Sequence, residues 1–114
     1  MITEDFALAN RLFTILDEGI VDGYDFFSYK VDIGDGYIDA VLTVENEGVV
    51  TTDAKRDVNN AEVFGIILKL KENSISRGED WRSLIMSYRH GEQVKLNFNQ
   101  KRNYYEGNPG HTPF

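Results

Sequence analysis

The chain has 114 residues, of which 41% are hydrophobic and 27% charged, values close to those of an average globular protein. This length is enough for one domain but not for two, and the composition excludes a disordered or fibrous protein. Cysteine is absent, which excludes disulfides, a thiolate metal site and a cysteine nucleophile. No basic and apolar leader opens the sequence, so we expect a cytoplasmic protein without a membrane segment.

The formal net charge of -7 is distributed unevenly along the chain. Residues 1–53 contain 12 acidic and 2 basic residues, whereas residues 54–114 contain 7 acidic and 10 basic ones. An acidic surface repels phosphate groups, so neither nucleic acid nor an anionic membrane is an expected ligand. The favoured partner is a basic protein, and the alternative is a charged surface that serves solubility alone.

The first half of the chain carries a helical pattern and then strand patterns. Apolar residues recur every three or four positions, at Phe6, Ala9, Leu12, Phe13 and Leu16. This spacing predicts an amphipathic helix from about residue 3 to Gly19, which we expect to end the helix in the left-handed conformation. Alternating apolar and polar residues predict strands at 26–33 and 37–45, joined by a tight turn at Gly34-Asp35-Gly36. A β-branched run predicts a third, short strand at 49–52.

The second half carries another helix and another hairpin. Asn60 can cap a helix whose apolar pattern continues to about residue 72, and the polar residues 73–80 predict a loop. Trp81 then leads into two strands, joined by the turn His90-Gly91-Glu92. We therefore expect one α+β domain over residues 1–100, with an antiparallel sheet of about five strands and two helices in the order α-β-β-β-α-β-β. Residues 101–114 are polar and are expected to form a mobile tail.

The patterns that usually carry catalysis are weak in this sequence. The acids from Asp32 onward fail as a calcium loop, because Gly34 and Gly36 stand where oxygen ligands are required. His90 lies in a predicted turn and His111 in the predicted tail, neither of which is a rigid, desolvated setting for a general base. We therefore expect no enzymatic activity, no metal and no cofactor. Two alternatives stay open: a small metal-dependent hydrolase that uses these acids, and a structural subunit that self-associates through its strand edges.

An acidic surface on the first hairpin is the strongest candidate for a binding site. Alternation along the strands places several carboxylates on the solvent side, others lie at the tip and base of the hairpin, and two aromatic residues lie among them. The predicted acidic set consists of Asp22, Asp25, Asp32, Asp35, Asp39, Glu45 and Glu47, with Phe26 and Tyr37 as aromatic anchors. We expect this set to steer and dock a basic protein.

Residues 79–99 resemble the C-terminal hairpin of the YezG-like immunity proteins. Trp81 enters a strand, a hydrophobic run follows, Gly91 lies in the turn, and Lys95 and Phe98 stand in a Lys-x-x-Phe-Asn pattern. The resemblance covers about a fifth of the chain. It implies an α+β fold with an N-terminal helix, a meander, a second helix and this hairpin, in which Trp81, Lys95 and Phe98 are structural.

The same resemblance implies a function. Members of this family look like antitoxins, cytosolic proteins that bind and block a toxic domain delivered by a neighbouring bacterium, often a nuclease. Nucleases are commonly basic because they bind polyanions, so an acidic inhibitor is physically suitable. The expected partner is therefore a cognate toxin domain. The sequence does not determine the oligomeric state of the free protein, for which a monomer is favoured.

Overall fold

The computed structural model describes residues 3–100, apart from the side chain of Thr3. The elements in chain order are α1 (Thr3–Gly19), β1 (Phe26–Gly34), β2 (Tyr37–Asn46), β3 (Val49–Thr51), α2 (Asn60–Ser76), β4 (Ser83–Arg89) and β5 (Lys95–Asn99). This order and the α+β class confirm the prediction. The predicted tail at 101–114 lies outside the described residues.

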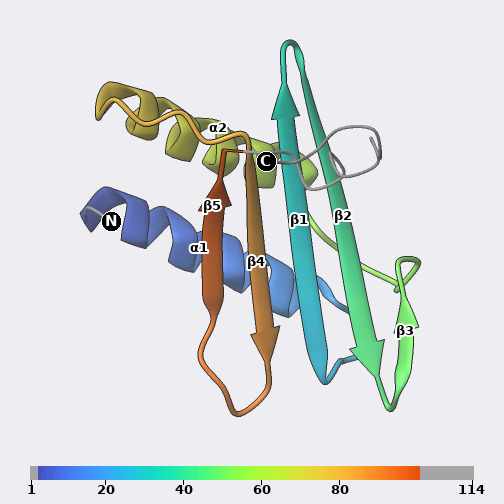
Figure 1. Ribbon diagram of the computed structural model, residues 1–114. Helices are drawn as coiled ribbons and strands as arrows, with labels where there is room; N and C mark the ends of the chain where they lie inside the picture. The colour runs from blue at the N-terminus through green and yellow to red at the C-terminus, as the bar shows by residue number, and fades with distance from the viewer. Residues whose placement is uncertain (1–2, 101–114) are drawn as a thin grey trace, which may run out of the picture.

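The five strands form one sheet in the order β3-β2-β1-β4-β5, and all neighbouring strands are antiparallel. Both helices lie on the same face of this sheet, behind β5, β4 and β1 in Figure 1, and β3 extends beyond them. The fold therefore has two layers, with β1 as the central strand.

The hydrophobic core lies between the helices and the sheet face that they cover. The fully buried apolar side chains include Leu12, Leu16, Phe27, Val31, Val63, Ile67, Leu70, Leu84 and Met86. Burial of each large apolar side chain contributes roughly 1.5–3 kcal/mol to the free energy of unfolding. Because side chains alternate along a strand, the other half of each strand points away from the helices.

We call this second sheet surface the open face. On the three central strands it consists of Phe26, Ser28, Lys30 and Asp32 of β1, Asp39, Val41, Thr43 and Glu45 of β2, and Ser83, Ile85, Ser87 and Arg89 of β4.

Among the residues that the structure describes, neither helix is long and apolar enough to cross a membrane.

The ends of α2 differ from the prediction. Asn59 rather than Asn60 is the cap, and its side chain accepts a hydrogen bond from the Glu62 amide at 3.1 Å. The helix also continues one turn further than predicted, to Ser76. Its last turn is held from outside, because Asn73 donates a hydrogen bond to the carboxylate of Asp5 at 3.0 Å. This long-range contact overrides the weak helix propensity of the local sequence.

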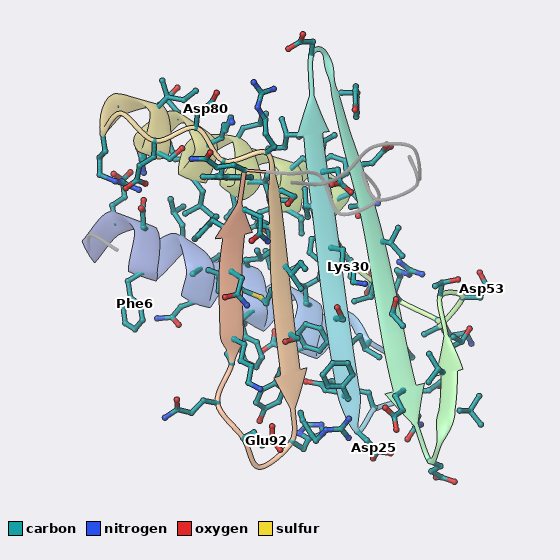
Figure 2. All side chains as sticks on the ribbon, viewed as in Figure 1. Phe6, Asp25, Lys30, Asp53, Asp80 and Glu92 are labelled. Atoms are coloured by element: carbon teal, nitrogen blue, oxygen red, sulfur yellow. The ribbon has the colours of Figure 1, made fainter. Side chains whose placement is uncertain are left out.

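Two expectations for α1 are also wrong. Gly19 ends the helix, but its φ is not positive, so it is not in the expected left-handed conformation. Glycine is needed there for space. A Cβ at this position would lie 2.6 Å from a methyl carbon of Val58 and 2.9 Å from the Asp57 carbonyl oxygen. Phe6, predicted to be in the core, is 62% exposed and lies on the side of α1 turned away from α2 (Figure 2). The buried residue of this turn is Asp5, whose carboxylate pairs with Arg77 at 2.9 Å.

Candidate functional site

The predicted acidic set is divided between the two ends of the β1–β2 hairpin. The tip group contains Asp32, Asp35, Asp39 and Tyr37, and the base group contains Asp22, Asp25, Phe26, Glu45 and Glu47. β1 has nine residues, so its ends are roughly 26 Å apart at ~3.3 Å per residue. Figure 2 shows Asp25 at the end of β1 opposite to the hairpin turn. Between the groups, Lys30 pairs with Val41 in the strand register.

The carboxylates of the tip group differ in exposure. Asp32 and Asp39 are directly opposite each other in the register of β1 and β2. Asp32 is only 5% exposed, because β1 is the central strand and Ser83 of β4 flanks it on the other side. The expectation that Asp32 is a surface contact residue is therefore wrong. Asp35 and Asp39 are exposed and remain accessible to a partner.

The ring of Tyr37 lies against the backbone of Gly34, the residue opposite it in the register. A side chain at Gly34 would collide with this ring, so glycine is needed there to seat the aromatic group. Tyr37 is nevertheless 40% exposed. It keeps a defined position at the tip of the hairpin, as an aromatic anchor requires.

Three members of the base group already have structural roles. The Asp25 carboxylate accepts a hydrogen bond from the Glu47 amide at 2.7 Å. Glu45 pairs with Arg89 at 3.4 Å, and the Arg89 guanidinium lies 4.8 Å from the ring centre of Phe26. Asp25, Glu45 and Phe26 therefore already have partners within the chain, and their role in binding another protein stays a prediction.

In the described part of the chain, Asp22 and Glu47 are the members of the base group that are exposed and whose carboxylates have neither an ion pair nor a hydrogen bond. Together with Asp35 and Asp39 they form the accessible part of the predicted set. We call these four residues the exposed acids.

An apolar groove, which the sequence patterns do not predict, lies between the hairpin tip and α2. Its volume is about 410 Å³, and its lining consists of Ile33, Gly34, Gly36, Tyr37, Ile38, Phe64 and Leu68. Leu68 is 52% exposed. The sequence feature that could have indicated this groove is the excess of apolar residues in α2. Phe64 and Leu68 widen the apolar surface of this helix beyond the single stripe that packs on the sheet.

His90 packs against aromatic rings. Its ring stacks on Tyr24 with 4.4 Å between the ring centres and meets the edge of Tyr88 at 5.3 Å. The Tyr24 hydroxyl donates a hydrogen bond to Asp17. Burial, and then this hydrogen bond, raise the pKa of Tyr24 above its usual value. Burial also raises the pKa of Tyr29 to about 12. Both tyrosine hydroxyl groups are therefore protonated at neutral pH. The rings of His90, Tyr24 and Tyr88 pack against one another and stabilise the fold.

Of the residues that carry the resemblance, Trp81 lies in the core, whereas Phe98 is 36% exposed. Trp81 is buried, its ring contacts that of Phe98 at 5.1 Å, and the Lys71 ammonium lies 5.2 Å from its centre. Lys71 also donates to Asp80 at 2.6 Å, and this hydrogen bond lowers the pKa of the Asp80 carboxyl group. Lys95, on the edge strand β5, is exposed.

Within residues 3–100, no group of three or more histidine, aspartate or glutamate side chains is arranged to hold a metal ion. No protein-family model matches the chain, and no curated protein sequence matches it.

Proposed function

We propose that this protein is an immunity protein, an antitoxin that binds a cognate toxin domain and blocks it by stoichiometric occlusion rather than by catalysis. The resemblance of residues 79–99 to the YezG-like family supports this role. The order of elements, α-β-β-β-α-β-β, is also the order that the resemblance implies. The expected toxin is a basic protein, and a nuclease has the required charge because it must bind phosphate groups.

The exposed acids are the observation that carries the proposal. Asp22, Asp35, Asp39 and Glu47 project from the two ends of one hairpin, and in the described part of the chain none of them is in an ion pair. Like charges on one hairpin repel each other, whereas a basic partner would attract them and associate faster. Such carboxylates compete with the phosphates of a nuclease substrate for the same basic surface.

The direct test is co-purification of the tagged protein from its native cells at low and at moderate salt. We expect a basic protein domain in an equimolar complex, and we expect toxin activity to fall to zero at a one-to-one ratio. Activity that persists at equimolar protein, or inhibition by far less than one equivalent, would contradict occlusion.

Charge reversal then tests the exposed acids with the recovered toxin. Two double variants are compared with the unchanged protein: Asp35→Lys with Asp39→Lys, and Asp22→Lys with Glu47→Lys. We expect both to slow association with the toxin and to weaken the salt dependence of the association rate. The effect should be about tenfold for the double variant whose acids face the toxin. Asp53→Lys is the control, since Asp53 is an exposed acid of the same half of the chain outside the predicted set. Equal association rates for both double variants and the control would refute the role of these acids.

A further inference from the structure

Most of β2 forms an outer edge of the sheet. β3 pairs only with Val44, Glu45 and Asn46 of β2. Residues 37–43 have β1 on one side, and no strand of the described chain pairs with them on the other. In Figure 1, β3 lies along one end of β2 and does not reach the end nearer the hairpin turn.

The register identifies which backbone groups point outward. Tyr37 is opposite Gly34 across a two-residue turn, and Asn46 is opposite Val49 across another. The residues that flank such turns bond to each other, and bonding directions alternate along a strand. Ile38, Ala40 and Leu42 therefore direct their amide and carbonyl groups away from β1. The described chain offers these groups no hydrogen-bond partner. Leu42 is only 2% exposed, so the accessible part of this edge lies at Ile38 and Ala40. An unpaired edge of this kind is a template for another strand.

An added strand would meet different surfaces on its two sides. On the helix side, its side chains would enter the apolar groove beside Ile38, Phe64 and Leu68. On the open face, its alternate side chains would lie beside Asp39, Val41 and Thr43. The complementary strand therefore has apolar side chains on the helix side and a basic side chain beside Asp39 on the open face.

The surface of α2 next to the groove leaves room for such a strand. Gly65 lies one turn before Leu68 and is exposed, and a Cβ there would have no heavy atom within 4 Å. Glycine is a poor helix former, and no close contact in the described structure requires it at this position. The missing side chain keeps the approach to Leu68 open.

We propose that the edge at Ile38 and Ala40 binds an extended segment of a partner protein as an additional antiparallel strand. The segment places an apolar side chain in the groove and a lysine or arginine beside Asp39. A second copy of this chain fits poorly, because its acidic hairpin would bring like charges toward Asp39. This inference deepens the proposed function by naming a binding mode, and it rests on that function only for the claim that the natural partner is a toxin domain.

The test uses a synthetic heptapeptide, acetylated and amidated, of sequence GKLKLKG. We expect it to slow hydrogen exchange at the amides of Ile38 and Ala40 by about tenfold or more at saturation. A GELELEG peptide should give no protection, because its acids face Asp39. A GKLKLKG peptide N-methylated at both leucines should also fail, since leucines that face the groove must donate their amides to β2.

Matched variants separate the groove from general charge effects. Leu68→Lys should weaken binding of fluorescently labelled GKLKLKG by about tenfold, because it fills and charges the groove. Ile75→Lys is the control, since Ile75 is 56% exposed on the same helix but outside the groove. Asp39→Asn should weaken binding, whereas Asp53→Asn should not.

Several outcomes would overturn the proposal. Protection at β5 instead of β2, equal binding of the lysine and glutamate peptides, or equal affinities of the Leu68→Lys and Ile75→Lys variants would each do so. Protection of the β2 edge that grows with protein concentration in the absence of peptide would assign this edge to a second copy. Peptide binding with these signatures, together with no toxin in co-purification, would keep the binding mode and remove the antitoxin function.

Discussion

Glu47 adopts a backbone conformation that is unusual for its side chain. Its φ is 54°, and Gly48 after it has a φ of 82°. Two successive positive φ values in a two-residue hairpin loop define the type I′ turn, which favours Asn-Gly. The Asp25 carboxylate, 2.7 Å from the Glu47 amide, holds the turn in place. The acid at position 47 is therefore retained at a conformational cost that asparagine would reduce.

Replacing Glu47 by asparagine should stabilise the protein. We expect Glu47→Asn to raise the free energy of unfolding by about 0.5–1 kcal/mol, because asparagine tolerates the left-handed region better than glutamate. Glu47→Gln removes the same charge without this conformational benefit and is the matched control. Urea denaturation of the three proteins measures the difference. Equal stability of the Asn and Gln variants would show that charge, not backbone strain, controls this turn.

At the scale of elements, two glycines in the helices have opposite environments. Gly19 ends α1 in close contact with the backbone of Asp57 and the side chain of Val58, whereas Gly65 faces open space on α2. Neither has a positive φ. The same substitution at the two sites therefore separates the effect of packing from that of helix propensity.

We expect Gly19→Ala to lower the free energy of unfolding by about 1–3 kcal/mol, because the added methyl group must displace Val58 or the backbone of Asp57. Gly65→Ala should raise it by about 0.5–1 kcal/mol through helix propensity alone. Thermal and urea denaturation of both variants test this. A loss of stability in Gly65→Ala would mean that the position has a packing role, and a neutral Gly19→Ala would mean that the contact relaxes at little cost.

Local patterns were sufficient to predict the seven elements and the alternating faces of β1 and β2. They were insufficient at the last turn of α2, which depends on Asp5, a residue 68 positions away from Asn73. They also predicted the direction of Asp32 but not its burial, because alternation identifies a face and says nothing about which strand is central. The β2 edge and the apolar groove depend on the short length of β3 and on the position of α2, neither of which follows from periodicity.

For the whole molecule, the distribution of charge affects stability as well as binding. The net charge is -7, and the whole excess of acidic residues lies in the first 53 residues. The arrangement brings Asp39 directly opposite Asp32 across β1 and β2, and like charges that face each other across strands destabilise a sheet. Repulsion between exposed charges weakens when salt screens them, with a screening length of about 10 Å at ~0.1 M ionic strength.

The free protein should therefore be more stable at moderate salt than at low salt. We expect Asp39→Asn to raise the free energy of unfolding by roughly 0.2–1 kcal/mol at low ionic strength and to reduce its dependence on sodium chloride. Asp53→Asn removes an equal charge from the connection after β3 and should have a smaller effect on both. Urea denaturation across a salt series measures these quantities. If Asp39→Asn and Asp53→Asn behave alike, the total charge of the molecule, rather than the facing pair, accounts for the salt dependence.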